Sequence, residues 1–258
     1  MADKKIGFIG GGRVTSILLS GWRRAEAMPG KVTVFDCSQE ALTALQANTP
    51  GIETTSEMAT AASQDVVFLA VHPPVIKDVL PQLKPHLHSG TVLVSLAPKF
   101  TIAKLSEMLG GFDRIVRMIP NAPSVVGKGL NPLAFAPAIE GDEREAVFQM
   151  LQPLGDCPEV PEEQLEAYAI IAAMGPTYFW PQLYELKSLA ESFGLSEQAA
   201  VEAVDKMLWG TVATMKDSGL SPEQVQDLIP VKPMADETAS LVAAYRQKLT
   251  GLMEKIRP

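Results

Sequence analysis

Short apolar runs alternate with longer amphipathic stretches up to about residue 160. The runs that predict strands are Lys5–Ile9, Lys31–Phe35, Asp65–Val71, Thr91–Ser95 and Arg114–Ile119. Continuous apolar runs of this kind are typical of parallel strands whose two faces are both covered. Because helical stretches separate the runs, the pattern predicts βαβ units and an α/β fold with a doubly wound sheet.

The pattern changes at the Pro-containing segment Gly155–Pro161, beyond which little strand character remains. Helices are predicted at Glu162–Ala173, Pro176–Phe193, Ser196–Lys216, Ser221–Leu228 and Asp236–Ile256. Ser196 and Ser221 precede their helices as N-cap residues. We therefore expect an N-terminal domain of residues 1–158 and an all-helical domain of residues 159–258.

The predicted helices of the second half have long apolar faces. The residues on two of these faces are Tyr168, Ile171 and Ala172, and then Leu183, Leu186, Leu189 and Ala190. An intramolecular bundle would cover them, and so would the same helices of a second copy of the chain. We favour a homodimer formed through the helical domain.

Composition and charge narrow the range of partners. The chain has 258 residues, 22 Lys and Arg against 30 Asp and Glu, and a net charge of −8, which disfavours a nucleic-acid surface. No apolar run approaches the ~20 residues that cross a bilayer, and the first residues lack the apolar core of a signal peptide. Two cysteines make neither a disulfide framework nor a zinc site. We expect a cytoplasmic protein without a membrane segment.

A metal site is not expected either. His86 and His88 are two residues apart in a loop flanked by Pro85 and Gly90, with no carboxylate or cysteine nearby. Metal sites use more ligands than this pair supplies, so a solvated turn is the preferred interpretation.

A glycine-rich turn follows the first predicted strand and opens the first helix. Its sequence, Gly10–Thr15, fits G-x-G-x-x-(small). Gly10 permits a tight turn, and Gly12 lets the backbone approach a diphosphate. The helix start, at Arg13 and Val14, supplies free N–H groups, and the Arg13 side chain can reach a phosphate. A merely structural strand–helix turn is the alternative.

Asp36 ends the second predicted strand, where an acidic residue can accept hydrogen bonds from the adenosine ribose. A 2′-phosphate would meet like charge there, so Asp36 favours NADH over NADPH. Ser38 is compatible with either coenzyme. Asp36 and Ser38 can also cap the next helix, and that role does not conflict with ribose binding.

Several segments in order along the chain resemble one enzyme family. They are Ile6–Gly12, Val71–Pro73, Val94–Ala97, Arg117–Pro123, Val126–Gly129 and Gly175–Phe179. The chain resembles the pyrroline-5-carboxylate reductases over almost its full length, and the Arg-Met-Ile-Pro-Asn-Ala-Pro segment is the most specific part. The resemblance implies a Rossmann domain, an interleaved helical dimer, and NADPH as the family's coenzyme.

The implied chemistry is hydride transfer from a reduced nicotinamide to the carbon of a cyclic C=N bond. By resemblance, Val71, His72 and Pro73, together with Ala97 and Pro98, contact the nicotinamide. The turn that contains Asn121 and Pro123 is implied to separate the coenzyme from the substrate. Asn121 offers both a donor and an acceptor, which suits an amide or imine edge; a turn residue held between prolines is the less favoured alternative.

The resemblance also implies substrate contacts in the helical domain, at Gly175 and Thr238, and Lys232 of the same loop is a further candidate as a point charge. Thr238 is implied as the donor to the reacting nitrogen, with helix capping as an equal alternative. Tyr178 is expected to pack rather than to transfer a proton.

The helical domain departs from the family at two places. The family's Ser-Gly-Ser is Ala172–Met174 here, and its Ser-Pro-Gly-Gly-Thr-Thr loop corresponds to 231–238, where only Thr238 is kept. Asp236 and Glu237 place negative charge beside the implied carboxylate site, and Lys232 can offset it only as a point charge. His72 and Pro98 differ from the usual residues as well. The substrate pocket is therefore expected to differ from that of the family and to suit a neutral, larger or cationic imine or carbonyl compound.

Three functions remain open at this stage. The first is an NAD(P)H-dependent reductase of a C=N bond, and the second is a small dehydrogenase with another hydride acceptor. The third is a non-catalytic dinucleotide-binding dimer that has lost its substrate loop.

Overall fold

A computed structural model describes residues 4–258 of the chain, and it divides into two compact units. The first runs to Met174 and also includes Leu252–Pro258; we call it the sheet unit. The second, Gly175–Gly251, is the helical unit. The structural division after Met174 lies later in the chain than the expected boundary at residue 158. The reason is that the first helical segments after residue 158 pack within the sheet unit.

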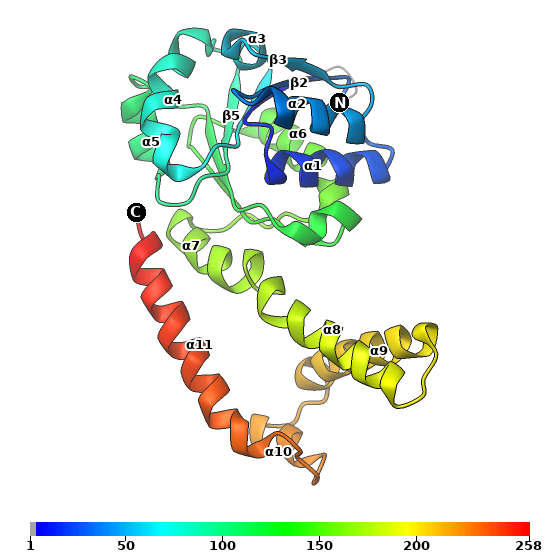
Figure 1. Cartoon of the computed structure of the whole chain (residues 1–258). Coiled ribbons are helices and arrows are strands. Elements are labelled where there is room, and N and C mark those ends of the chain that lie inside the picture. The colour runs from blue at the N-terminus through cyan, green and yellow to red at the C-terminus, as the bar shows by residue number, and fades with distance from the viewer. Residues whose placement is uncertain (1–3) are drawn as a thin grey trace. The chain divides into compact units, whose positions relative to one another are not determined.

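The sheet unit is built around one seven-stranded sheet (Figure 1). Its strands are β1 (Lys5–Ile9), β2 (Lys31–Phe35), β3 (Glu53–Thr55), β4 (Val66–Leu69), β5 (Val92–Ser95), β6 (Ile115–Met118) and β8 (Leu133–Phe135). Their order is β3-β2-β1-β4-β5-β6-β8, and all pairs are parallel except β6 with β8. This is the Rossmann order, so the predicted fold class is confirmed.

All five predicted strands are present, with ends that differ by at most two residues. Sequence patterns did not predict β3, β8 or the separate parallel pair β7 (Gly129–Leu130) and β9 (Gly155–Asp156). These strands have only two or three residues, too few to show a period. The polar Glu53-Thr54-Thr55 of β3 is held at the sheet edge by backbone pairing with β2.

Helices cover both faces of the sheet, as continuous apolar strands require. They are α1 (Arg13–Arg24), α2 (Gln39–Asn48), α3 (Met58–Ala62), α4 (Ile76–Leu83), α5 (Ile102–Met108) and α6 (Gly141–Leu151). One buried cluster contains Phe8, Trp22 and Phe68, and the Trp22 indole N–H donates to the Met150 carbonyl of α6 at 2.8 Å. A second cluster on the other face contains Leu69 and Leu80.

The helix that follows the glycine turn, α1, ends at Arg24. Its last turn closes because the Ala25 and Glu26 N–H groups donate to the carbonyls of Gly21 and Arg23. Glu26 then adopts a left-handed conformation with φ of 54°, which cannot continue a right-handed helix.

The predicted helix over Glu162–Ala173 has three parts. A 3₁₀ turn at Glu162–Gln164 leads into α7 (Leu165–Tyr168) and then into a π-helix at Ala169–Ala173. Single π-helical turns often mark functional sites. All three parts belong to the sheet unit.

The remaining predicted helices are present within two residues of the expected ends. They are α8 (Pro176–Ser192), α9 (Glu197–Asp217), α10 (Pro222–Asp227) and α11 (Ala235–Ile256), whose last turn belongs to the sheet unit. Ser196 caps α9 through the Ala199 N–H, and Ser221 forms a capping box with Gln224. No helix within residues 4–258 is long and apolar enough to span a membrane.

Candidate active site

The strand order reverses between β1 and β4, which makes the carboxyl ends of these strands the topological switch point of the sheet. The Gly10 N–H donates to the Phe35 carbonyl at 2.8 Å, and the Ala70 N–H donates to the Ile9 carbonyl at 2.9 Å, so the strand ends are joined side by side. In open α/β sheets, ligands bind at this switch point. The predicted glycine turn therefore lies where a dinucleotide is expected.

Gly10 and Gly12 have different physical roles in this turn. Gly10 has φ of +112°, and a Cβ added there would lie 2.5 Å from the Ala70 carbonyl oxygen, so only glycine fits. A Cβ on Gly12 would meet no protein atom within 4 Å. Gly12 is thus not required for protein packing, and its bare backbone leaves room for a ligand. Thr15 fits the third small position because its hydroxyl donates to the Gly10 carbonyl at 2.6 Å.

The N-terminus of α1 is suited to an anion. Gly12 is its N-cap residue, no side chain caps it, and its first turn has no acidic residue. The first intrahelical bond runs from the Ser16 N–H to the Gly12 carbonyl, so the N–H groups of Arg13 and Val14 precede the helical ladder. These donors and the helix dipole fit a diphosphate, and Arg13 is exposed beside them.

Asp36 is fixed beside the same turn. Its Oδ2 accepts from the Gly11 N–H at 2.7 Å, and its Oδ1 accepts from the Ser38 N–H at 2.8 Å. Ser38 caps α2 by accepting from the Ala41 N–H. The carboxylate is therefore held in place, half-buried, at the end of β2, where it keeps lone pairs for a ribose.

Two more predicted segments lie at the same edge of the sheet. Val71, His72 and Pro73 follow β4, and Ala97 and Pro98 follow β5, the next parallel strand. His72 is exposed, whereas Ala97 is buried. Since β1, β4 and β5 are neighbours, the topology brings these loops and the glycine turn to one edge.

Asn121 follows β6 and is only 4% exposed. Its N–H donates to Asn131 Oδ1 at 2.9 Å, and its side-chain Nδ2 donates to the Ala172 carbonyl at 2.9 Å. Its Oδ1 is buried and has no partner among residues 4–258. An unsatisfied buried acceptor is costly, so a ligand with an N–H donor would satisfy it. Pro123, half-buried, lies in the 3₁₀ turn that follows.

Asn131 supports this turn and was not predicted. Its Oδ1 accepts from the Ser124 hydroxyl as well as from the Asn121 N–H, and it is fully buried. A lone asparagine before Pro132 gives no sequence signal that separates such a support from an ordinary turn.

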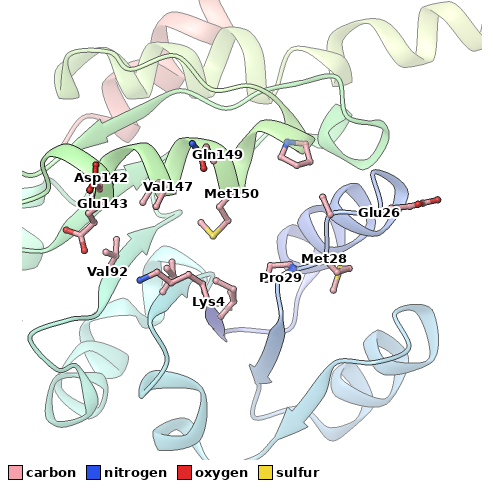
Figure 2. A pocket seen from close by; sticks show the side chains of 15 residues that line it. Lys4, Glu26, Met28, Pro29, Val92, Asp142, Glu143, Val147, Gln149 and Met150 are labelled. Carbon is pink, nitrogen blue, oxygen red and sulfur yellow. The ribbon is translucent and has the colours of Figure 1, made fainter. Parts of the chain in front are cut away.

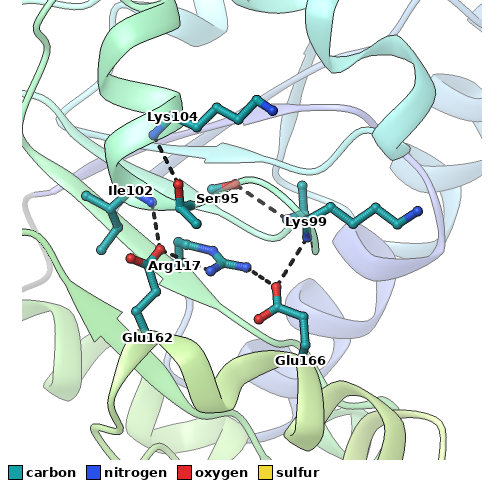
Figure 3. Close-up of polar contacts among 9 residues, drawn as sticks. Ser95, Lys99, Ile102, Lys104, Arg117, Glu162 and Glu166 are labelled. Carbon is teal, nitrogen blue, oxygen red and sulfur yellow. Dashed lines mark hydrogen bonds and ion pairs between the residues drawn. The ribbon is translucent and has the colours of Figure 1, made fainter. Parts of the chain in front are cut away.

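Glu166 and the role of Arg117 were also missed. Figure 3 shows Arg117 of β6 between the carboxylates of Glu162 and Glu166. Its Nη2 is 2.5 Å from Glu166 Oε1, and its Nη1 is 3.0 Å from Glu162 Oε1. Arg117 and Glu166 are buried. The sequence did contain a signal: an arginine in an apolar strand needs a buried acid, and Glu162 and Glu166 are one helical turn apart.

The remaining predicted residues lie in the helical unit. Gly175 precedes α8 as its N-cap residue, and Lys232 is exposed before α11. Thr238 lies in the first turn of α11, where its hydroxyl donates to the Met234 carbonyl at 3.0 Å. Tyr178 packs edge-on against Tyr245. Burial is the larger cause, and the nearby Tyr245 hydroxyl the smaller one, that raises the pKa of Tyr178 above its ordinary value.

A separate cavity of about 570 Å³ lies at the opposite, amino-terminal edge of the sheet (Figure 2). Apolar side chains such as Met28, Val92 and Met150 line it, with Lys4 and Glu143 among the charged ones. It contains none of the residues predicted to bind the coenzyme, so we do not assign the active site there.

Among the described residues, neither a metal centre nor a reactive Cys157 thiol is supported as part of the site. Within residues 4–258 no group of three His, Cys, Asp or Glu side chains is placed to hold a metal ion. Burial, as the largest cause, raises the pKa of Cys157 from 9.0 to about 11, so its thiol stays protonated at neutral pH.

The fold, the glycine turn and the carboxyl-edge loops are those of a dinucleotide-binding protein of Rossmann type, the architecture that nicotinamide-dependent oxidoreductases use. In agreement, residues 5–99 match the family described as NADP oxidoreductase, coenzyme F420-dependent.

Over its full length the chain is similar to pyrroline-5-carboxylate reductases. It is 28% identical to the enzyme of Corynebacterium melassecola over 94% of this chain and 89% of that one. A solved pyrroline-5-carboxylate reductase from Coxiella burnetii is 26% identical, with a TM-score of 0.70 over 99% of this chain and 95% of that chain. An NADP-bound pyrroline carboxylate reductase from Plasmodium falciparum shares the fold, with 24% identity and a TM-score of 0.78 over 99% and 96%. The predicted resemblance is confirmed.

Proposed function

We propose that this protein reduces a cyclic C=N bond with a hydride from NAD(P)H, as a pyrroline-5-carboxylate reductase does. The observation that carries the proposal is the similarity to those reductases along 94% of the chain, beyond the coenzyme-binding half. The unpartnered Oδ1 of Asn121, at the edge that would hold the nicotinamide, is independent support.

The residues of the sheet unit would bind and orient the two reactants. Gly12 and the first turn of α1 would hold the diphosphate, while Val71, Pro73 and Ala97 would line the nicotinamide. The bound reduced nicotinamide supplies the hydride. Holding both rings in reactive orientation is the larger part of the protein's contribution.

Asn121 would help to align the reacting partners. Its Nδ2 is already bonded to the Ala172 carbonyl, so the side chain cannot turn freely. The fixed Oδ1 would accept from the nicotinamide amide or from the N–H of a protonated imine. A buried acceptor gains most when such a donor fills it.

NADH is the proposed coenzyme. Asp36 is locked by the Gly11 and Ser38 N–H groups, so its charge cannot move away from a 2′-phosphate. Such like charges repel strongly at close range. NADPH is the alternative coenzyme, because the similar enzyme from Plasmodium falciparum was solved with NADP bound. Titration of this protein with both coenzymes distinguishes the two.

The proposed substrate is a cyclic imine that differs from pyrroline-5-carboxylate. Lys232, Asp236 and Glu237 replace the glycine-containing loop of the family and are all exposed. A less anionic, larger or cationic imine suits that charge pattern better than a carboxylate. Thr238 remains the proposed donor to the reacting nitrogen, a role that would require its hydroxyl to leave the Met234 carbonyl.

The active form is proposed to be a homodimer through the helical unit. Large side chains there are exposed, with Phe193 at 80% and Trp209 at 75%. Many large apolar side chains exposed on one unit are typical of an association surface.

Oxidation of NADH and NADPH in the presence of pyrroline-5-carboxylate and of neutral cyclic imines tests the proposal. We expect turnover with at least one imine, and a preference for NADH. Coenzyme binding without turnover of any imine or carbonyl compound would instead favour the non-catalytic dimer, for which the altered 231–238 loop is the specific argument.

A further inference from the structure

One buried carboxylate is bonded both to a loop of the active-site edge and to strand β6, which leads into the Asn121 turn. Glu166 Oε1 accepts from the Lys99 backbone N–H at 3.2 Å and from Arg117 Nη2 at 2.5 Å. Its side chain is 2% exposed. Figure 3 shows Lys99 and Arg117 approaching it from separate segments.

The first loop is held in a strained conformation. Lys99 directly follows Ala97 and Pro98, the residues proposed to contact the nicotinamide, and its φ is 73°. A non-glycine residue adopts such a φ only when its surroundings enforce it. The bond from its N–H to Glu166 is one such restraint, and Glu162 adds another by accepting from the Ile102 N–H at 2.6 Å.

The second loop is held from the same helical segment. Arg117 lies on β6 shortly before Asn121, and the Asn121 side chain donates to Ala172, in the π-helix that follows α7. Residues 165–173 therefore contact the nicotinamide loop and β6 through Glu166, and the Asn121 turn through Ala172.

We propose that Glu166 is a positioning residue, which fixes the distance between the Ala97–Lys99 loop and the Asn121 turn. In this way it sets where the nicotinamide and the imine meet. The inference rests on the proposed function. A neutral or shorter side chain would leave Arg117, whose Nε already lacks a partner among the described residues, short of a buried counter-charge.

The test compares two ligands and one rate. ADP-ribose carries the adenosine and diphosphate but lacks the nicotinamide ring, so its binding reports only the glycine turn. In Glu166→Gln we expect unchanged affinity for ADP-ribose, severalfold weaker affinity for NADH, and kcat lower by about a hundredfold. Glu143→Gln is the matched control, because Glu143 pairs with Arg114 next to the other end of β6; all three values should stay as in the wild type.

A second variant guards against misfolding. Arg117→Met with Glu166→Leu removes both buried charges together, which such pairs often tolerate. It should be soluble and should show the same selective loss of NADH affinity.

The outcomes separate this inference from the proposed function. Equal loss of ADP-ribose and NADH affinity, or no change in affinity and kcat, would overturn the role of Glu166. A wild type that binds both ligands but turns over no imine would contradict the proposed reaction. The positioning role of Glu166 would still be tested, by comparing the ratio of NADH affinity to ADP-ribose affinity in Glu166→Gln and in the wild type. A wild type that binds neither ligand would overturn both.

Discussion

The two compact units of this chain bury their apolar residues to very different degrees. In the sheet unit, large side chains such as Phe8, Trp22 and Phe68 are fully buried. Between residues 175 and 251, all of which the structure describes, Ala200 is the one buried apolar residue. Trp209, Phe193 and Tyr184 are each at least 73% exposed.

This contrast indicates what each unit needs. The sheet unit has a complete core on both faces of its sheet, so it can hold a preformed coenzyme site. The helical unit exposes the apolar surface that would normally drive folding. Its stability is therefore expected to depend on another surface, for which a second copy of the chain is the proposed partner.

The largest effect is expected in the sheet unit, at Gly12. Gly12→Val places its side chain in space that the protein leaves open, so folding should be unaffected and the diphosphate should be excluded. We expect NADH affinity to fall by at least about a hundredfold, with an unchanged melting temperature. Isothermal titration and thermal denaturation measure the two effects. An unaltered NADH affinity would show that the glycine turn does not bind the coenzyme.

Asn121→Ala removes the unpartnered acceptor and the bond to Ala172. We expect kcat to fall by about fiftyfold, while the Kd of NADH rises at most severalfold, because the glycine turn still holds the diphosphate. Steady-state kinetics with the best imine measure the loss. If only the melting temperature falls and kcat is kept, Asn121 is a structural turn residue.

A third change addresses the helical unit. Trp209→Lys places a charge in the exposed apolar surface and should weaken the homodimer by about thirtyfold. Sedimentation velocity at several concentrations measures the dissociation. Asp142→Lys, an exposed charge change on α6 of the sheet unit, should leave the dimer intact. A Trp209→Lys protein as dimeric as the wild type would contradict the proposed interface.

A smaller effect is expected at Asp36. Asp36→Ala removes the fixed carboxylate that would repel a 2′-phosphate, so the ratio of NADPH to NADH affinity should rise by about tenfold. Fluorescence titrations with both coenzymes measure the ratio. A constant ratio would exclude Asp36 from ribose recognition.

The smallest effect concerns pH and belongs to the sheet unit. Burial raises the pKa of Cys157 to about 11, whereas the unfolded thiol ionises near 9.0. The unfolded state therefore loses its proton first, so the free energy of unfolding should fall as pH rises from 9.0 to about 11. Urea denaturation at several pH values, compared with Cys157→Ala, isolates this effect. Parallel pH profiles of the two proteins would refute it.

Much of the fold followed from local patterns. Apolar runs such as Lys31–Phe35 are strands because both faces are covered, and Ser196 and Ser221 begin helices because they cap them. The polar strand Glu53–Thr55 depends on pairing with β2, a contact distant in sequence. Such pairings cannot be obtained from a short window.

The candidate site was predictable to a similar extent. Gly10, Gly12 and Asp36 follow a motif whose spacing is set by the βαβ unit. Glu166 meets Lys99 and Arg117 only through the folded chain, so its contribution was missed. For Thr238 and Lys232, sequence resemblance supplied roles that local geometry in the helical unit does not test.

The central claim is that the chain transfers a hydride to the carbon of a cyclic imine, and isotope transfer tests it most directly. NADH carrying deuterium on the transferred position of its nicotinamide would be incubated with the wild type and the imine, and the product examined by mass spectrometry and NMR. We predict one deuterium on the former C=N carbon of the product. Reduced coenzyme that stays unconsumed, or a product without deuterium at that carbon, would contradict the account.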